Sequence, residues 1–443
     1  MEIKKVLVAN RGEIALRAIR TIQKMGKQAI AVYSTADKDA LYLKYADASI
    51  CIGGPNSTQS YLNIPSIISA AEISECDAIF PGYGFLSENQ NFVEICNHHK
   101  IKFIGPGIDV MRIMSDKSKA KEAMRKVGVP VIPGSKGALS SIAEAKNLAN
   151  EMGYPVIVKA SAGGGGRGMR VVHKEEDLEK SYLAAKSEAA SAFGDGTLYM
   201  EKFIQKPRHI EVQVMGDKHG NAIHIGERDC SLQRRHQKLI EESPAVLLDE
   251  KTRQRLLETA VKATKALGYE NAGTFEFLVD EDKNFYFMEM NTRLQVEHCV
   301  SEMVSGLDII ELMINVAEGK ELPPQESIKC EGHSIECRIT AEDPVSFRPS
   351  PGRITRAITP GGQNVRFDSH IYSGYNVPSY YDSMIGKLVV WDKNRQRAIA
   401  LMKQALKELQ IEGIKTVKDF HLEMMDNVDF INNNFDTNYL ANH

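Results

Sequence analysis

Apolar and polar positions alternate along the chain in a way that divides it into short strands and amphipathic helices. Residues 4–10, KKVLVAN, have the pattern of a buried strand, and residues 12–26 follow with an apolar stripe at helical spacing. The inner face of that helix carries Ile14, Ala15, Ala18, Ile19 and Ile22. Two more strand-and-turn units, DAIFPGYGF and KIKFIGP, come later. This order predicts a small Rossmann-like parallel sheet flanked by helices over residues 1–114.

The pattern changes after this first region. Residues 109–128 have a helical pattern, and the Pro-, Gly- and Ser-rich stretch VPVIPGSKGALSS marks a hinge near residue 133. We therefore expect a helical linker over 115–133 and a small α/β segment over 134–203. A long third region, 204–443, has strand pairs and helices and ends in a β-rich and then helical stretch.

The stretch VIVKASAGGGGRGMRVV, residues 156–172, places a glycine-rich loop between two strand-like runs. Its glycines satisfy the spacing G-x-G-x-x-G, but a dinucleotide fingerprint needs a helix after the loop, and β-branched Val171 and Val172 stand there instead. A phosphate-binding Walker loop needs Gly-Lys-Ser/Thr, which is missing. A hairpin flap that covers nucleotide phosphates fits, with Lys159 and Arg167 supplying positive charge. A flexible surface loop fits this stretch equally well.

Composition limits the class of protein. The chain has 443 residues, 43% of them hydrophobic and 26% charged, which is typical of a globular protein of roughly three domains. A net charge of −3 gives no electrostatic footprint for nucleic acid or a membrane surface. We expect no leader peptide and no membrane helix, because the N-terminus enters a strand pattern directly. The seven cysteines include no C-x-x-C pair, which favours a cytoplasmic location and argues against zinc.

The segment TFEFLVDEDKNFYFMEMN predicts a hairpin that opposes two carboxylates. With residues 281–284 as the loop, Asp280 faces Phe285, and counting outward places Glu276 opposite Glu289. At about 5 Å their repulsion is roughly 3 kcal/mol at an effective dielectric constant near 20. A divalent cation would reverse the sign, and Asn291 would add a third oxygen ligand. The alternative is one glutamate exposed to solvent or paired with lysine.

The same side of the strand continues into NTRLQVEH. If the chain stays extended, Arg293, Gln295 and Glu297 project from the face that carries Glu289 and Asn291. Such a row suits a small polar substrate beside a metal-bound phosphate, with Arg293 holding an anion and Glu297 acting as a general base. A solvated edge strand is the alternative.

A basic cluster lies in RDCSLQRRHQK, with Arg234, Arg235, His236 and Lys238. Runs of this kind are usually solvated surface, and nucleic acid is disfavoured because no aromatic side chains lie nearby. Cations for a phosphate or carbonate site are the functional alternative. His209 alone is more often a structural histidine than a ligand.

Together these motifs resemble those of biotin carboxylases, members of the ATP-grasp superfamily. The resemblance covers essentially the whole chain and extends to ANRGEIALRAIR, PGYGFLSEN, MEKFI, MEMNTRLQVEH, ECRITAEDP and VPSYYDSMIGKL. It implies an α/β fold with a Rossmann-like domain at 1–114, a mobile ATP-grasp lid at 134–203 and a C-terminal domain at 204–443. It also favours the phosphate-covering flap over the surface loop.

The resemblance also assigns roles to residues. Glu297, Arg338, Arg293 and Lys238 correspond to catalytic positions. The implied ATP contacts are Lys117, Lys159, Gly163, Gly164, Gly165, Gly166, Glu201, Lys202, Ile204, His209, Gln233, His236, Glu276 and Glu289. Metal ligands would be Glu276, Glu289 and Asn291, and the bicarbonate pocket would comprise Lys238, Arg293, Gln295, Val296 and Glu297. Biotin would lie at Tyr83 and Arg338.

The implied activity is ATP-dependent carboxylation of biotin with bicarbonate, through carboxyphosphate, CO₂ and a biotin enolate. ATP would come with Mg²⁺ or Mn²⁺, two ions in all. No Met-Lys-Met tripeptide is present, so biotin would be a substrate carried on a separate carrier protein. The expected setting is a homodimeric subunit of acetyl-CoA carboxylase, working with a biotin carboxyl carrier protein and carboxyltransferase subunits in fatty acid synthesis.

Three positions depart from the family pattern: Phe80, Ala162 and Cys299 stand where histidine, glycine and proline are usual. None removes a chemical group that the implied reaction needs. The alternatives are a subunit of a pyruvate or propionyl-CoA type carboxylase, which would perform the same half-reaction, another ATP-grasp carboxylate ligase, and a non-catalytic nucleotide-binding regulator.

Overall fold

The computed structural model describes residues 2–160, 168–235 and 237–442 and divides the chain into two compact units. The first unit comprises 1–129, 208–277 and 289–443, and the second comprises 130–207 with the hairpin tip 278–288. Gly163, Gly164, Gly165, Gly166, Arg167, Ala162 and His236, all named in the sequence predictions, lie outside the described residues.

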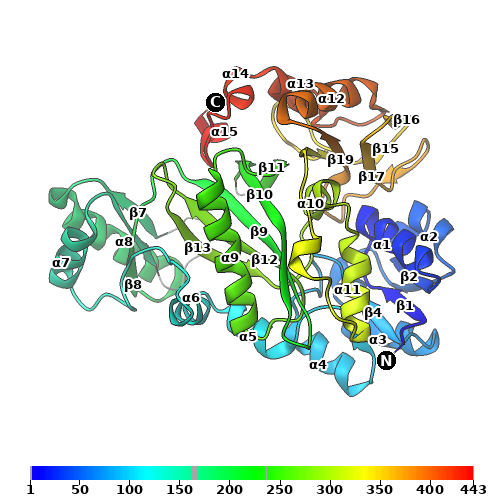
Figure 1. The fold of residues 1–443 in the computed structure, drawn as a ribbon, viewed down its shortest axis with the longest axis horizontal. Coiled ribbons are helices and arrows are strands. Elements are labelled where there is room, and N and C mark those ends of the chain that lie inside the picture. The colour runs from blue at the N-terminus through cyan, green and yellow to red at the C-terminus, as the bar shows by residue number, and fades with distance from the viewer. Residues whose placement is uncertain (1, 161–167, 236, 443) are drawn as a thin grey trace. The chain divides into compact units, whose positions relative to one another are not determined.

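The N-terminal part of the first unit is the predicted parallel sheet (Figure 1). Its strand order is β3-β2-β1-β4-β5, and the neighbouring strands are paired in parallel. The strands are β1 (Lys5–Val8), β2 (Gln28–Ser34), β3 (Ala48–Gly53), β4 (Ala78–Phe80) and β5 (Lys102–Phe103). The helices are α1 (Gly12–Lys24), α2 (Leu41–Tyr45), α3 (Ile64–Ile73), α4 (Gln90–His98), α5 (Ile108–Ser115) and α6 (Lys117–Lys126).

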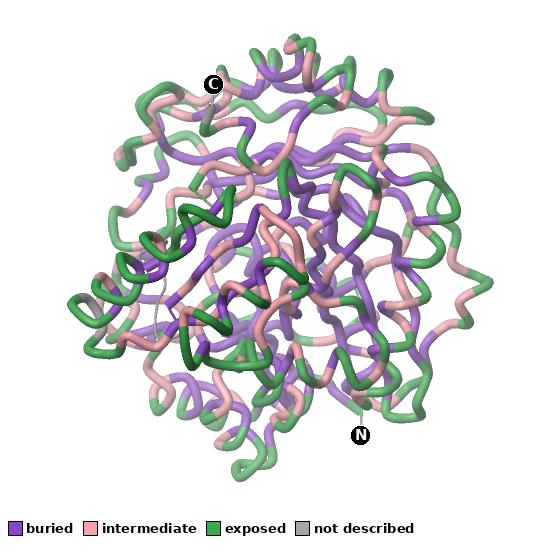
Figure 2. The backbone as a smooth tube through the Cα atoms, turned by 90° about the vertical axis from the view of Figure 1, so that its left-hand side faces the viewer, coloured by how far each residue is buried: buried purple, intermediate pink, exposed green. Residues whose placement is uncertain are grey.

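Helices cover both faces of this sheet because the strand residues alternate between two cores. Val6 and Val8 of β1 pack with Ile14 and Ile19 of α1, as the sequence predicts, whereas Leu7 packs on the other side with residues of α3 and α4. All of these side chains are buried. Buried residues are drawn in purple along the backbone tube in Figure 2. The two cores fix the edge of the sheet from which the loops Asn10–Gly12 and Pro81–Phe85 emerge.

The larger sheet of the first unit has eight strands in the order β13-β12-β9-β10-β11-β14-β19-β17. Its members are β9 (Arg208–Gly216), β10 (Ala222–Arg234), β11 (Gln237–Ser243), β12 (Asn271–Val279), β13 (Phe285–Asn291), β14 (His333–Thr340), β17 (Val365–Ser369) and β19 (Met384–Asp392). The pairings of β9–β10, β10–β11, β11–β14, β14–β19 and β17–β19 are antiparallel. Strands far apart in sequence, such as β11 and β14, thereby become neighbours.

Helices pack on this sheet and complete the first unit. Helix α9 contacts β9 and β10, α10 contacts β10, β11, β14 and β19, and α12 contacts β14 and β19. The helices are α9 (Glu250–Ala266), α10 (His298–Ser305), α11 (Ile309–Glu318), α12 (Arg395–Glu408), α13 (Lys418–Asp426), α14 (Val428–Ile431) and α15 (Tyr439–Asn442). Small peripheral strands are β15 (Gly352–Arg353), β16 (Arg356–Ile358), β18 (Asn376–Val377) and β20 (Gln410–Glu412).

The second unit is a small α/β body built on the antiparallel sheet β7-β6-β8. It contains α7 (Ile142–Met152), β6 (Val156–Ala160), β7 (Met169–Val172), α8 (Leu178–Phe193) and β8 (Leu198–Lys202). Val156, Val158 and Met200 form its core with alanines of the two helices. The strand-like runs on either side of the glycine-rich stretch are therefore β6 and β7, which pair with each other.

Three local expectations need correction. The helical pattern over 109–128 forms two helices, because Asp116 caps α6 by accepting hydrogen bonds from the backbone N–H groups of Ser118 and Lys119. The hairpin loop is also shorter than expected: Asp280 N–H donates to Asn284 O, so Asp280 faces Asn284 and not Phe285. Finally, the chain is not extended through Glu297, because β13 ends at Asn291 and a turn at 296–297 leads into α10.

The described residues supply two further facts about surface and chemistry. None of their helices is both long and apolar enough to traverse a bilayer. All seven cysteines are free thiols, of which Cys51 and Cys330 are exposed.

Close backbone packing at the end of β9 generates the first prediction. A Cβ atom on Gly216 would lie 1.9 Å from the carbonyl oxygen of Tyr269, which must then move. We expect Gly216→Ala to lower the free energy of unfolding by about 1–3 kcal/mol, as overpacking does. Gly361→Ala is the matched control, because a Cβ there meets no atom within 4 Å. Equal thermal stability of the two variants would contradict this packing.

Candidate functional site

Alternation along β14 separates an apolar face from a charged one. Ile335, Cys337 and Ile339 belong to the core that contains the apolar side of α12. Glu336 and Arg338 must then point to the opposite face, the one that α10 contacts. Lys387, which pairs directly with Arg338 across β14 and β19, shares that face and is fully buried. The charged interior of the first unit is therefore a property of strand geometry.

Lys238 is the centre of this charged face. Its Nζ donates to Glu211 Oε2 at 2.6 Å, Glu297 Oε1 at 2.7 Å and Glu276 Oε1 at 2.9 Å. Burial opposes the charge on Lys238, but the three carboxylates outweigh it and raise the pKa of the ammonium well above its ordinary value. One cation thus joins the ends of β9, β11, β12 and α10.

Arg228 holds Glu211 from behind. Its Nε donates to Glu211 Oε1 at 2.6 Å, and its NH1 donates to Gln213 Oε1 at 2.8 Å and to Ser301 Oγ at 2.9 Å. Neither Arg228 nor Glu211 is exposed to solvent. All the described hydrogen bonds of this guanidinium go to buried side chains, so its role is to hold Glu211 in position beside Lys238.

Glu276 accepts a convergent set of hydrogen bonds. Besides Lys238, Asn291 Nδ2 donates to its Oε1 at 2.9 Å and Gln295 Nε2 at 3.0 Å. His209 Nε2 lies 3.1 Å from the other oxygen. Burial favours the neutral acid, but the charge of Lys238, together with the neighbouring imidazole of His209, holds the pKa of Glu276 far below its usual range.

Arg293 ties this segment together although the strand has ended. Its NH2 donates to Asn291 Oδ1 at 3.0 Å, its NH1 to Gln295 Oε1 at 2.8 Å and its Nε to Glu88 Oε2 at 2.9 Å. Asn291, Arg293 and Gln295 therefore do gather on one side, as predicted. The hydrogen bonds, and not an extended backbone, bring them together.

Glu297 lies between two cations. Oε1 accepts from Lys238, and Oε2 accepts from Arg338 NH2 at 3.0 Å, while Arg338 Nε donates to Glu241 Oε1 at 2.6 Å. Burial favours neutral Glu297, but the charges of Lys238, Arg338 and Arg228 hold its pKa well below the ordinary value. Burial also opposes the charge on Arg338, yet Glu241 and Glu297 raise its pKa. In this arrangement Glu297 is an ionised carboxylate.

Glu276, Glu289 and Asn291 fit a hard divalent cation by their chemistry. They offer carboxylate and amide oxygens from two neighbouring strands of the eight-stranded sheet. Burial, followed by the charge of Glu276, raises the pKa of Glu289, because the carboxylates of Glu276 and Glu289 repel each other. Lys117 Nζ, 4.0 Å from Glu289 Oε2, compensates this repulsion only in part. Because the hairpin closes at Asn284, counting residues outward from the loop does not place Glu276 directly opposite Glu289. The two carboxylates nevertheless lie close enough to interact.

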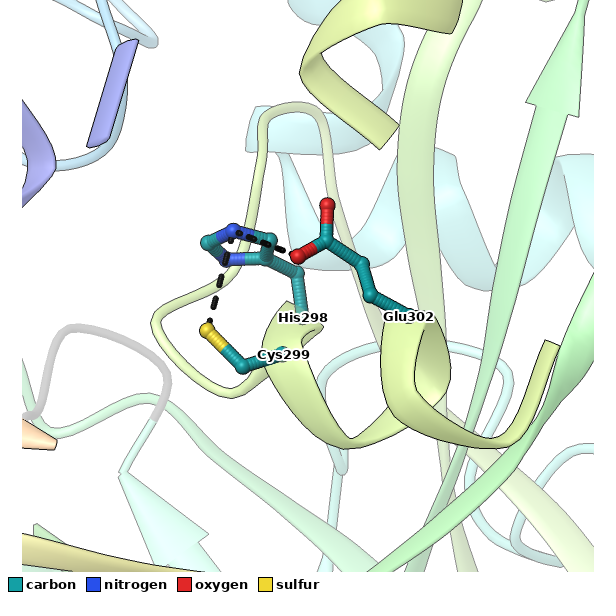
Figure 3. A group of neighbouring side chains, drawn as sticks. All are labelled: His298, Cys299 and Glu302. Carbon is teal, nitrogen blue, oxygen red and sulfur yellow. Dashed lines mark hydrogen bonds and ion pairs between the residues drawn. The ribbon is translucent and has the colours of Figure 1, made fainter. Parts of the chain in front are cut away.

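A second group of ligand-type side chains, His298, Cys299 and Glu302 of α10, is shown in Figure 3. His298 Nε2 lies 3.8 Å from both Cys299 Sγ and Glu302 Oε2. Glu302 is already paired with Arg17 at 2.9 Å and Arg366 at 2.7 Å. Two guanidiniums beside the carboxylate make this group a structural ion-pair network, unsuited to an added cation.

A cavity of about 470 Å³ lies beside Arg338 in the first unit. Tyr83, Val296 and Arg338, which the sequence predicts as biotin and bicarbonate contacts, all line it. The Tyr83 hydroxyl donates to Glu13, and Lys387 Nζ donates to the Val296 carbonyl at 2.8 Å. The structure thus brings these three residues to one opening next to the Glu297 carboxylate.

The predicted nucleotide contacts fall in both units. Lys117, His209, Gln233, Glu276 and Glu289 belong to the first, where Gln233 pairs across the β10–β11 hairpin with Lys238. Lys159, Glu201, Lys202 and Ile204 belong to the second. There Lys159 Nζ forms an ion pair with Glu201 Oε2 at 2.6 Å, whereas Lys202 donates to the carbonyls of Gly153 and Tyr154.

Sequence reasoning missed several residues of the site. Glu211 and Arg228 lie under Lys238, Glu241 holds Arg338, Glu88 holds Arg293, and Lys387 contacts Val296. A signal for Glu211 was present, because His209, Glu211 and Gln213 recur at every second position of β9, the period of one strand face. The contacts of Glu88, Glu241 and Lys387 link segments distant in sequence, which no local pattern reveals.

The buried pair Arg228–Glu211 generates the second prediction. Arg228→Met leaves Glu211 with one cation instead of two in a site without solvent, so we expect a loss of about 3–5 kcal/mol in the free energy of unfolding. Arg397→Met is the matched control: Arg397 forms an exposed ion pair with Asp392, and its loss should not change stability measurably. Denaturant unfolding measures both. A loss for Arg228→Met as small as that for the control would contradict this role.

Comparison with known protein families identifies the relatives of this chain. The biotin carboxylase N-terminal domain matches residues 2–111, the ATP-binding domain of the carbamoyl-phosphate synthase L chain matches 116–325, and the biotin carboxylase C-terminal domain matches 336–442. The chain is 53% identical to a biotin carboxylase of Nostoc sp. over 442 residues, 99% of each chain.

Solved structures agree with this match. A biotin carboxylase from Campylobacter jejuni in a β,γ-ATP complex is 74% identical, has a TM-score of 0.93 and is matched over 100% of this chain and 99% of that one. The biotin carboxylase domain of a 2-oxoglutarate carboxylase from Hydrogenobacter thermophilus, in complex with MgADP, ADP and bicarbonate, is 48% identical with a TM-score of 0.90, over 100% and 98% of the two chains. The predicted fold class is confirmed, and the chain belongs to the biotin carboxylase family of ATP-grasp ligases.

Proposed function

We propose that this protein uses ATP and bicarbonate to carboxylate biotin held by a separate carrier protein. The observation that carries the proposal is the position of Glu297. It is one buried carboxylate held between Lys238 and Arg338, at the side of a cavity that Tyr83 also lines. A general base, two cations for anionic substrates and an opening for a ring-sized ligand are thus adjacent.

Glu297 is the proposed base for bicarbonate. Burial opposes the charge on Glu297, but its proton affinity is low because Lys238 and Arg338 neutralise it. A bicarbonate anion held by Lys238 and Arg293 would draw positive charge away from Glu297, which raises its proton affinity when the substrate is present. The deprotonated oxygen would then attack the γ-phosphorus of ATP, giving carboxyphosphate and ADP. Gln295 and the Val296 backbone complete the proposed bicarbonate pocket.

Arg338 is the proposed partner of the biotin enolate. Carboxyphosphate would break down to CO₂ and phosphate, the phosphate would take the N1 proton of biotin, and the enolate would attack CO₂. The guanidinium of Arg338 is fixed at Nε by Glu241 and at NH2 by Glu297, and Arg338 lines the cavity. A fixed donor stabilises charge that develops in the transition state without having to reorganise.

The nucleotide and metal assignments belong to the same proposal. Lys117, His209, Gln233 and His236 of the first unit, and Lys159, Gly163–Gly166, Glu201, Lys202 and Ile204 of the second, would contact ATP. Glu276, Glu289 and Asn291 would hold Mg²⁺ or Mn²⁺, which supplies positive charge to the phosphate oxygens when bound. Residues 134–203 would act as the lid. The linker 115–133 connects the lid to the 1–114 domain, and the C-terminal domain begins directly after it at residue 204.

The acyl acceptor defines two versions of the proposal. The first is the biotin carboxylase subunit of a cytoplasmic acetyl-CoA carboxylase, a homodimer that works with a biotin carboxyl carrier protein and carboxyltransferase subunits. The second is the equivalent subunit of a pyruvate or propionyl-CoA type carboxylase. Both have the same half-reaction, and transfer of the carboxyl group to each acyl acceptor by the purified complex distinguishes them.

Release of phosphate from Mg-ATP tests the reaction itself. The purified protein is assayed with bicarbonate and free biotin each present or omitted. We expect turnover that requires bicarbonate and increases with biotin. ATP cleavage that is indifferent to both would contradict the proposal and would favour another carboxylate ligase.

A substitution at Glu297 tests its role as the base. Glu297→Gln keeps the size of the side chain but removes the base, and we expect bicarbonate-dependent ATP cleavage to fall by about 10²–10⁴-fold. Glu122→Gln, at an exposed carboxylate paired with Lys126, is the matched control and should keep wild-type turnover. Full activity in Glu297→Gln would exclude Glu297 as the base.

A further inference from the structure

Two glutamates that do not touch substrate in the proposed reaction face each other next to Arg338. Glu241 of β11 and Glu336 of β14 are direct partners in the antiparallel register, and neither is exposed to solvent. Opposed side chains on neighbouring strands share a face and lie about 5 Å apart at Cβ. The sheet therefore forces two carboxyl groups together in the interior.

The hydrogen bonds of this pair are unequal. Glu241 Oε1 accepts from Arg338 Nε at 2.6 Å. Glu241 Oε2 and both oxygens of Glu336 have no hydrogen-bond partner among the described residues. An ionised carboxylate buried without donors is strongly disfavoured, and two of them side by side even more so. A single proton on Glu336 removes one charge and supplies an O–H donor for Glu241 Oε2.

We propose that Glu241 and Glu336 share one proton as a buried carboxyl pair, and that this pair positions the Arg338 guanidinium and makes its affinity for anions depend on pH. Both are positioning residues, because they act on substrate only through Arg338. The functional half of this inference rests on the proposed reaction, whereas the shared proton does not.

The surrounding charges support a single proton. Lys387 of β19, Arg338 of β14, Lys238 of β11 and Glu297 at the start of α10 are the charged groups that act on the pair. The cations are already engaged, since Lys387 lies 3.2 Å from Glu13, and Lys238 and Arg338 contact Glu297. Burial is the largest effect on both glutamates and raises the pKa of Glu241 to about 7 and that of Glu336 well above its ordinary value.

The consequence for Arg338 follows from charge. With one proton the pair carries a single negative charge, which neutralises the Arg338 guanidinium less than two charges would. Arg338 can then attract an anion in the cavity. When pH rises and the proton leaves to solvent, the pair carries two negative charges beside the same guanidinium. The attraction of Arg338 for a developing enolate then falls. Protonation is thus required for the active form, and alkaline pH removes it.

Infrared spectroscopy of the full-length protein tests the shared proton without any substrate. A protonated carboxyl group has a C=O stretch that is separate from that of carboxylates and shifts in D₂O. We expect the wild-type spectrum near neutral pH to contain such a band that Glu336→Gln removes and that Glu122→Gln, the exposed control, leaves unchanged. If Glu336→Gln and wild type show the same band, the shared proton is wrong.

The pH profile of kcat/KM for biotin tests the coupling to Arg338. For the wild type we expect a decline of about tenfold per pH unit above the upper apparent pKa of the pair. In Glu336→Gln, an amide N–H can donate to Glu241 Oε2 permanently, so this alkaline decline should disappear. In Glu241→Gln, Arg338 loses its anionic anchor, and kcat/KM for biotin should fall at every pH.

The outcomes separate this inference from the proposed function. An alkaline decline that persists unchanged in Glu336→Gln would overturn the coupling. A protein without biotin-dependent turnover would overturn the proposed function and with it the coupling, while the infrared difference between wild type and Glu336→Gln would still decide whether the two carboxyl groups share a proton.

Discussion

The contact on which the rest of the site depends is the buried ammonium group of Lys238. It is within 2.9 Å of carboxylates from β9, β12 and the start of α10, and no other described side chain touches all three. Without it, Glu211, Glu276 and Glu297 would repel one another in an interior that offers little solvent. The cation therefore determines where the proposed metal ligand Glu276 and the proposed base Glu297 can lie.

The same logic extends outward from Lys238. Arg228 holds Glu211 from the far side, Arg338 holds the second oxygen of Glu297, and Glu241 holds Arg338. Each charge is neutralised by the next, so the network tolerates burial while it keeps one carboxylate and one guanidinium beside the cavity. The apolar face of β14, packed on α12, supplies the rigid support behind it. Strand alternation makes both faces possible from one sequence.

Sequence patterns predicted which helices and strands form better than they predicted which of these elements contact one another. The parallel N-terminal sheet and the hairpin of β12 and β13 follow from local periodicity and are confirmed. Asn291, Arg293 and Gln295 do converge as predicted, but through the hydrogen bonds of Arg293 and not through strand periodicity. The break at Asp116 was readable, since Asp is a preferred helix N-cap residue and the helix-forming run KSKAKEAMRK follows it directly. The contacts of Glu241 with Arg338 and Glu336 were not, because they depend on the pairing of β11 with β14, strands separated by about ninety residues of chain. The hairpin bulge at Lys283, with positive φ, likewise shifts a register that counting alone cannot correct.

In the proposed reaction, bicarbonate that is deprotonated at Glu297 attacks the γ-phosphorus of ATP. Cleavage of ATP with ¹⁸O-labelled bicarbonate tests this most directly, because the attacking oxygen stays on phosphorus when carboxyphosphate breaks down. We expect inorganic phosphate that carries one labelled oxygen derived from bicarbonate. Phosphate whose new oxygen comes from water would contradict it, because water and not bicarbonate would then be the nucleophile.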